Sequence, residues 1–209
     1  MKITPFFLDS NNQTIVSGKT IASRVSGQGK LHLWEERTSA VIDTVVIHYA
    51  SAEAVDPKRR FDMRRIAVIF CDLGVSCHYL IDRSGKTFSM VPEAKKAWHC
   101  GGSIMPSPDD RRMVNAFSIG IELIATPVSG FTQKQYGSLT RLCRDIEKRH
   151  GHPMIYVGHE DIAGKRAVAL GLRKDLKTDP GAGFNWDRFF HDLRRPSKTL
   201  KPSARRPCR

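Results

Sequence analysis

The chain has 209 residues, of which 40% are hydrophobic and 26% are charged. These proportions are ordinary for a globular protein, and the length allows one well-filled core, so we expect a single domain. No apolar run approaches the roughly 18 residues that a membrane-spanning helix needs. The formal net charge of +13 indicates an acidic partner, either nucleic acid or a polymer rich in carboxylates.

The first part of the chain is polar and rich in Ser, Gly, Asn and Gln. Residues 1–40 therefore predict an N-terminal arm with one or two short strands. The short apolar patch at the start is broken by Pro5 and closed by Asp9. A secretory signal needs about 7–15 apolar residues, so the sequence favours a cytoplasmic protein.

The next region alternates strand and helix patterns. The β-branched run 41–48 predicts a buried central strand. Residues 56–73 are amphipathic and predict a helix with Asp56 as its N-cap and Pro57 in its first turn. Two apolar runs within 78–91 flank a short polar turn, which predicts a β-hairpin.

The second half of the chain continues this mixture. We expect strands over 118–124 and 154–157 and helices over 132–150 and 186–193. Because strands and helices do not alternate regularly, the expected fold is mixed α/β, with a central mixed β-sheet flanked by α-helices in one domain over 41–194.

The last residues, 195–209, contain three prolines and several basic side chains without an aromatic residue, which predicts a disordered tail. From Arg194 onward the chain holds seven basic residues and no acid. This tail either attracts a polyanion or is a solvated segment without a specific role.

Three polar side chains carry the strongest functional signal. His48 ends the first apolar strand, His159 lies in a cluster over 157–163, and Asp179 lies in a second cluster over 177–181. A lone strand-end histidine is usually a core residue, and Asp before Pro-Gly can simply start a turn. Two histidines and one carboxylate around zinc, however, leave a fourth position for water, which is the arrangement of a catalytic site. The set predicts a zinc hydrolase.

Six segments, in this order, resemble the zinc-dependent type-2 N-acetylmuramoyl-L-alanine amidases, particularly their cytoplasmic AmpD-like branch, whose fold is shared with peptidoglycan recognition proteins. The segments are Val45–Tyr49, Ser76–Gly85, Val91–Glu93 with Ala97–His99, Asn115–Leu123, Gly158–Ala163 and Lys177–Gly181. The family cleaves the amide that joins the lactyl group of N-acetylmuramic acid to L-alanine, in peptidoglycan or in the muropeptides of wall recycling.

The resemblance also implies the roles of five side chains. His48, His159 and Asp179 would bind Zn²⁺, Glu122 would be the general base, and Lys177 would stabilise the transition state. Partial burial at its strand suits Glu122 to this role, because desolvation raises a carboxyl pKa toward the working range of a base. The alternatives are an ion pair with an arginine for Glu122 and a solvated loop position for Lys177.

Further residues near these motifs are candidates for substrate contact. Trp98 and His99 are expected to form a groove wall that contacts sugar or peptide, and Asn115 to support the substrate or the loop geometry. His78 and His99 are also possible metal ligands by residue type. We expect His78 to be mainly structural.

The chain departs from the family pattern in three places. The connection 164–176 is longer than usual and is expected to form a basic lid or a short helix at the groove edge. Leu176 stands where the AmpD-like branch usually has Arg, which leaves open whether the substrate is intact wall or an anhydro-muropeptide. Cys77 stands where other branches carry a catalytic Tyr, which favours the mechanism based on Glu122.

Two other functions compete with the amidase. A non-catalytic peptidoglycan-binding module of the same fold usually lacks a zinc ligand, whereas all three are present here. A nucleic-acid-binding protein would fit the charge, but the basic residues do not interleave with aromatic ones and no recognition motif is found. Oligomeric state and the bacterial or phage origin of the chain do not follow from the sequence.

Overall fold

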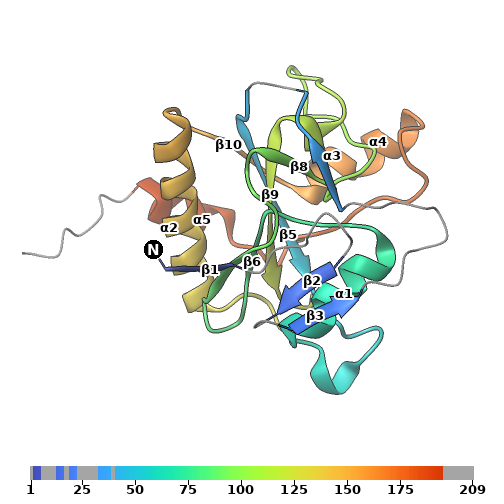
Figure 1. Cartoon of the computed structure of the whole chain (residues 1–209). Helices are drawn as coiled ribbons and strands as arrows, with labels where there is room; N and C mark the ends of the chain where they lie inside the picture. Colours follow the sequence, from blue (N-terminus) through green and yellow to red (C-terminus); the bar gives the residue numbers. More distant parts are fainter. Residues whose placement is uncertain (1, 6–12, 17–18, 23–32, 39–40, 195–209) are drawn as a thin grey trace, which may run out of the picture.

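The computed structural model describes residues 2–5, 13–16, 19–22, 33–38 and 41–194 (Figure 1). Strand β9 (Ser118–Ile124) lies at the centre of its sheet, and all seven of its residues are buried. It pairs in parallel with β5 (Thr44–Ala50) on one side and with β6 (Tyr79–Ile81) on the other. A strand that is covered on both faces reads as a continuous apolar run, which explains the composition of this segment.

Three further strands complete the sheet. β10 (Ile155–Gly158) pairs in parallel with β5, β7 (Thr87–Ser89) pairs antiparallel with β6, and β1 (Ile3–Pro5) pairs in parallel with β7. The strand order is β1-β7-β6-β9-β5-β10. The expected mixed sheet and the hairpin within 78–91 are therefore both confirmed.

Helices cover the two faces of this sheet (Figure 1). The long helix α2 (Gln133–His150) and α5 (Trp186–Arg194) contact each other and share one hydrophobic core with β5, β6 and β9. Helix α1 (Met63–Leu73) belongs to a second core on the opposite side, and the short helices α3 (His159–Ala163) and α4 (Lys165–Ala169) follow β10. The mixed α/β architecture follows from these layers.

The helix expected over 56–73 is divided in the structure. Asp56 caps a separate 3-10 turn, Pro57–Arg59, and Asp62 is the N-cap of helix α1. The side chain of Asp62 accepts hydrogen bonds from two amides of the first helical turn. Both aspartates have N-cap chemistry, so the local pattern alone placed the helix start at the earlier one.

Helix α2 begins where the sequence indicated. The hydroxyl of Thr132 accepts from the backbone N–H of Gln135, and the Gln135 side chain accepts in return from the backbone N–H of Thr132. This capping box satisfies two amides that a helix start leaves without partners. The strand and the last helix expected near residues 154–157 and 186–193 are also present, as β10 and α5.

Successive side chains of the central strands point to opposite faces of the sheet. Ile47 of β5 and Ile121 of β9 belong to the core under α2 and α5. Their neighbours His48, Gly120 and Glu122 therefore face the opposite side, toward α1 and α3. The polar residues of the candidate site thus share one face of the sheet.

The N-terminal 40 residues contain four short strands among their described positions, more than the one or two that the sequence predicted. Besides β1, strands β2 (Gln13–Val16) and β3 (Lys19–Ala22) form a separate antiparallel pair, and β4 (Trp34–Glu36) pairs with β8 (Lys95–Ala97). Two of the four are bonded to strands of the later chain. The basic tail over 195–209 lies outside the described residues, and the boundaries at 40 and 194 stay predictions.

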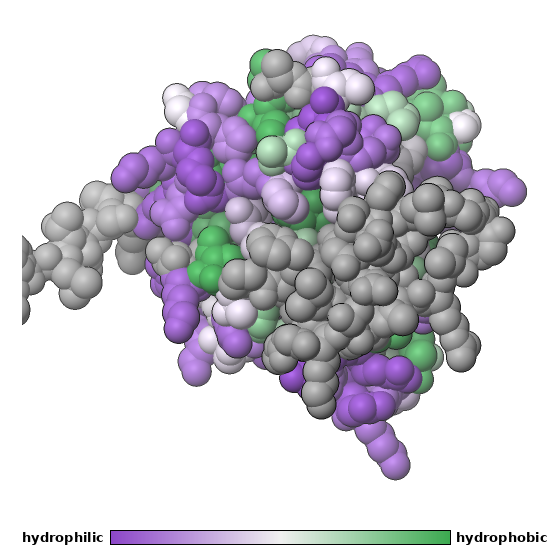
Figure 2. Space-filling view, viewed as in Figure 1, coloured by the Kyte–Doolittle hydropathy of each residue, from purple (hydrophilic) through white to green (hydrophobic). Residues whose placement is uncertain are grey.

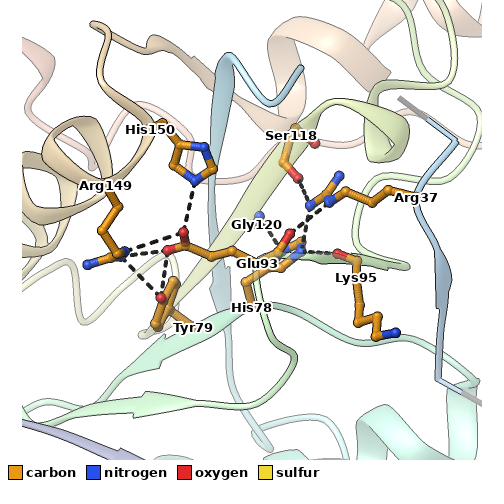
Figure 3. Close-up of polar contacts among 9 residues, drawn as sticks. All are labelled: Arg37, His78, Tyr79, Glu93, Lys95, Ser118, Gly120, Arg149 and His150. Carbon is orange, nitrogen blue, oxygen red and sulfur yellow. Dashed lines mark hydrogen bonds and ion pairs between the residues drawn. The ribbon is translucent and has the colours of Figure 1, made fainter. Parts of the chain in front are cut away.

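Arg37, just after β4, inserts its guanidinium between the strands (Figure 3). Its Nε donates to the carbonyl oxygen of Glu93 at 2.7 Å, and its two terminal nitrogens donate to those of Asn115, Ala116 and Ser118. Burial lowers the pKa of Arg37 to about 10, which leaves it charged at neutral pH. One side chain therefore ties four backbone carbonyls of distant segments together.

The carboxylate of Glu93 lies at the other end of the same cluster (Figure 3). It accepts hydrogen bonds from Tyr79 at 2.6 Å, Arg149 at 2.6 Å and His150 at 2.9 Å. Burial raises the pKa of Glu93, but these three hydrogen bonds outweigh it and leave the pKa below its usual value. The cluster joins the end of α2 to the sheet.

The surface shown in Figure 2 alternates hydrophilic residues with small hydrophobic patches among its coloured atoms. Within the described part of the chain, none of the helices has the length and hydropathy to cross a bilayer.

Arg37→Met should lower the free energy of unfolding by roughly 2–3 kcal/mol, because four carbonyl groups lose a charged donor while the apolar stem is kept. Urea denaturation followed by circular dichroism measures the change. Arg64→Met, which alters an exposed arginine of α1, is the matched control. Equal destabilisation by the two substitutions would contradict the role given to Arg37.

Candidate metal centre

Two histidines emerge at the same edge of the sheet. In the parallel pair of β5 and β10, Ile47 lies opposite Gly158. His48 and His159 each follow one of these paired residues, so both stand at the carboxyl ends of neighbouring parallel strands. In open α/β sheets this edge is where ligands bind.

Asp179 reaches the same place from the segment that precedes α5. The backbone N–H of Glu160 donates to the carbonyl oxygen of Asp179 at 2.8 Å, and the N–H of Gly181 donates to the Glu160 carboxylate at 3.2 Å. A Cβ on Gly158 would lie 2.8 Å from Cδ of Pro180, so only glycine allows this close packing. The segment is thereby anchored to the start of α3.

The three side chains converge on one point. Nδ1 of His48 lies 3.1 Å and Nδ1 of His159 lies 3.2 Å from the carboxylate of Asp179. One ligand atom from each residue lies within 4.8 Å of the others. Two imidazole nitrogens and one carboxylate oxygen are the donor types of a catalytic zinc site, so the residues present fit this metal.

The electrostatics of the cluster suit metal ligands. Burial, and then the neighbouring His159, lower the pKa of His48 to about 4. Burial raises the pKa of Asp179, but its hydrogen bonds with the two histidines outweigh this and leave the pKa well below its usual range. At neutral pH a neutral imidazole therefore faces an ionised carboxylate.

Glu122 lies beside this cluster. It pairs with His48 in the parallel register of β9 and β5, and only 9% of its surface is exposed. Burial, and then the charge of Asp179, raise its pKa well above the usual value, while the charge of Lys177 acts in the opposite direction. Its Oε2 is buried and has no hydrogen-bond partner among the described residues.

The cluster opens into a groove of about 950 Å³. Its lining includes the apolar side chains of Ile69, Phe70 and Leu73 of α1 together with Trp98, and the basic residues Lys96, Arg173 and Lys177.

The three residues expected to contact substrate all border this groove, in different ways. Trp98 lines it and donates from Nε1 to Glu35 at 2.8 Å. His99 is buried behind His48, whose Nε2 lies 3.1 Å from Nδ1 of His99. Oδ1 of Asn115 accepts from the backbone N–H of His99 at 3.2 Å, which supports the loop geometry. Direct substrate contact by the three stays a prediction.

Two other residues singled out in the sequence are structural in this fold. Nδ1 of His78 accepts from the backbone N–H of Gly120 at 2.9 Å, and its Nε2 lies 3.0 Å from both the carbonyl oxygen of Lys95 and a terminal nitrogen of Arg37. Cys77 is fully buried, its Sγ lies 3.4 Å from Sδ of Met90, and burial raises the pKa of its thiol.

The long connection 164–176 contains the short helix α4, one of the two structures expected for it. Its side chains bind the loop that precedes β9: Arg166 donates to the carbonyl oxygen of Met105 at 2.9 Å and Arg173 donates to that of Cys100 at 3.2 Å. A lid movement of this segment stays a hypothesis.

Sequence reasoning did not identify two contributors to the site. These are Arg37 and the apolar side chains that α1 adds to the groove lining, whereas Arg173 belongs to the connection expected at the groove edge. Arg37 stands in a polar segment without a motif, and nothing in the spacing predicts its distant partners. The amphipathic pattern predicted a helix in this region, but which of its apolar side chains line the groove depends on tertiary packing.

Known proteins resemble this chain in sequence and in structure. Residues 38–182 match the family model Amidase_2, described as N-acetylmuramoyl-L-alanine amidase. The "1,6-anhydro-N-acetylmuramyl-L-alanine amidase AmpD" of Escherichia coli K12 is 40% identical over 117 residues, which are 56% of this chain and 57% of that protein. The AmpD of Salmonella typhimurium LT2 is 37% identical over 117 residues, 56% of each chain. The match thus spans little more than half the length of these relatives.

Solved structures show the same architecture. A selenomethionine derivative of AmpD superposes with a TM-score of 0.63 at 30% identity and covers 82% of this chain and 93% of that one. AmiD of Escherichia coli, solved with anhydro-N-acetylmuramic acid-L-Ala-D-γ-Glu-L-Lys, gives a TM-score of 0.57 at 26% identity and covers 86% and 65% of the two chains. With the family match extending over more than half of its residues, the chain belongs to the N-acetylmuramoyl-L-alanine amidase family Amidase_2.

Proposed function

We propose that this protein is a zinc-dependent amidase that hydrolyses the amide between N-acetylmuramic acid and L-alanine in muropeptides. The observation that carries the proposal is the convergence of His48, His159 and Asp179 at a groove, with the buried Glu122 beside them. Zinc held by these three ligands would supply a Lewis acid that polarises a carbonyl and lowers the pKa of water.

Glu122 is the proposed general base. Its unpaired Oε2 belongs to a carboxylate that borders the groove next to His48. In this position it takes a proton from the attacking water and delivers it to the amide nitrogen as the bond to carbon breaks. Its raised pKa brings this carboxyl group closer to neutral pH, where a general base can both accept and release a proton.

Lys177 is proposed to stabilise the oxyanion that develops on the substrate carbonyl. Its backbone N–H donates to the carbonyl oxygen of Ala163 at 2.9 Å, which fixes the start of the segment that carries Asp179. The side chain is exposed and borders the groove. An ammonium beside a developing negative charge lowers the energy of the transition state.

The groove suits a substrate with both an apolar face and carboxylates. Trp98 offers an aromatic surface for a sugar ring, and Arg173 and Lys177 offer positive charge for a peptide stem. The names of the AmpD relatives and the ligand in the AmiD structure favour a 1,6-anhydro-muropeptide over intact wall as the substrate. A muropeptide substrate also agrees with the cytoplasmic location expected from the sequence.

Glu122→Gln should lower kcat by on the order of 10²–10⁴-fold while the protein keeps about one zinc per chain, since the base is lost and the ligands are untouched. Mass spectrometry of a defined anhydro-muropeptide after incubation measures release of the peptide with a free L-alanine amine. Elemental analysis measures the metal. Glu53→Gln, at a surface ion pair with Arg60, is the matched control.

Two results would count against the proposal. Full activity of Glu122→Gln would exclude Glu122 as the base. A wild-type protein that binds muropeptide and zinc but releases no peptide would instead support the non-catalytic binding module.

Lys177→Met should lower kcat by on the order of 10²-fold with little change in KM, because the charge acts mainly in the transition state. Lys174→Met, which alters an exposed lysine three residues earlier in the chain, is the control and should leave both constants unchanged. Steady-state kinetics on the same substrate separates the two constants. A rise in KM alone would show that Lys177 binds substrate and does not stabilise the transition state.

A further inference from the structure

A third histidine, His99, lies on the buried side of the metal cluster and contacts His48. Nε2 of His48 lies 3.1 Å from Nδ1 of His99, and Nε2 of His99 lies 3.3 Å from Oγ of Ser118. All three residues are buried, and His99 is 8% exposed. The imidazole of His99 therefore bridges a candidate ligand and a hydroxyl of the central strand.

The direction of these hydrogen bonds follows from the ligand geometry. Without metal, Nδ1 of His48 donates its proton to the ionised carboxylate of Asp179, whereas with zinc bound this nitrogen would offer its lone pair to the metal. The proton of the neutral ring is then on Nε2, which donates to Nδ1 of His99. His99 in turn carries its own proton on Nε2 and donates to Ser118. A single protonation pattern satisfies every nitrogen in the row.

The ring of His99 has little freedom to move. A Cβ on Gly120 would lie 2.4 Å from Cγ of His99, so the imidazole packs directly on the backbone of β9. The backbone N–H of His99 is bound by Asn115, and the ring of His78 stands edge-on at a centroid distance of 5.7 Å. Glycine at position 120 is the residue that makes room for this arrangement.

The other histidine of the cluster has no such support. Nε2 of His159 is buried without a hydrogen-bond partner in the part of the chain that the structure describes. The two candidate ligands therefore differ: His48 is held on both of its nitrogens, and His159 only on the side of Asp179.

From this asymmetry we infer that His99 is a positioning residue, which orients His48 for metal binding by accepting the Nε2–H of its ligating tautomer. The inference rests on the metal site of the proposed function. Ligating histidines usually donate this proton to a carboxylate, a carbonyl or water, and loss of such a partner typically costs 10–100-fold in metal affinity. Here the acceptor is a neutral imidazole.

The test compares two substitutions of His99. His99→Phe keeps a ring of similar size and removes the acceptor, whereas His99→Asn places an amide oxygen close to the position of Nδ1. Competition with a fluorescent chelator should give a zinc Kd about 10–100-fold higher for His99→Phe than for the wild type. His99→Asn should recover most of this loss.

A second readout needs no catalysis. Long-range ¹⁵N–¹H NMR of the zinc-loaded protein should show the Nε2–H of His48 as a hydrogen-bonded, slowly exchanging proton in the wild type and in His99→Asn. In His99→Phe this proton should exchange faster. His150→Phe, which removes an imidazole bonded to Glu93 far from the cluster, is the control for general destabilisation. It should lower Tm and leave zinc affinity and the exchange of the His48 Nε2–H unchanged.

The outcomes separate the inference from the proposals on which it rests. Equal zinc affinity and equally slow exchange of the His48 Nε2–H in the wild type and in folded His99→Phe would overturn the role of His99 alone. Wild-type protein that binds zinc but cleaves no muropeptide would overturn the amidase activity and leave the role of His99 standing. Wild-type protein that binds no zinc would overturn the metal site together with this inference. Loss of affinity in His99→Phe and His99→Asn alike would show that shape, and not the acceptor, is what His99 provides.

Discussion

The parallel register of β10, β5 and β9 is the constraint on which the site depends. It pairs His48 with Glu122 between β5 and β9. It also places His48 and His159 each one residue after the pair that Ile47 and Gly158 form between β5 and β10. A slip of one residue in β5 would turn His48 into the core under α2 and α5 and separate it from its partners, because side chains alternate along a strand. The apolar residues of the opposite face, such as Ile47 and Ile121, resist that slip. The same packing that stabilises the fold therefore aligns the ligands.

Polar side chains on a fully buried strand face are costly unless they are paired. In this structure, hydrogen-bond partners offset this cost for most of these side chains. His48 is bonded to Asp179 and His99, and Arg37 binds four carbonyl oxygens next to β9. The atoms without partners among the described residues include Oε2 of Glu122 and Nε2 of His159. Oε2 of Glu122 borders the groove where the proposed chemistry takes place, and Nε2 of His159 belongs to a candidate ligand that faces Asp179 through its other nitrogen.

The sequence predicted the elements that local patterns determine: the central strands, the hairpin and helix α2 with its Thr132 cap. It also predicted the three residues that the fold brings together, since each stood in a distinctive motif. It could not predict the place of His99, which was expected in a groove wall and lies mainly behind His48. That position depends on packing across Gly120, and the role of Arg37 likewise depends on contacts between segments far apart in the chain.

The hydrogen bonds that hold the 177–181 segment have a consequence for how this scaffold can diversify. Lys177 is bonded to Ala163, and Asp179 to Glu160, so both ends of the intervening connection are fixed on the same short helix, α3. The connection 164–176 joins these two fixed ends, whose separation does not depend on how many residues lie between them. The entropic cost of closing such a loop grows only slowly with added residues. Extra chain can accumulate there, as in the stretch that carries Arg173, without shifting the carboxylate at the loop's far end. Selectivity and metal geometry can thus evolve independently of each other in this protein.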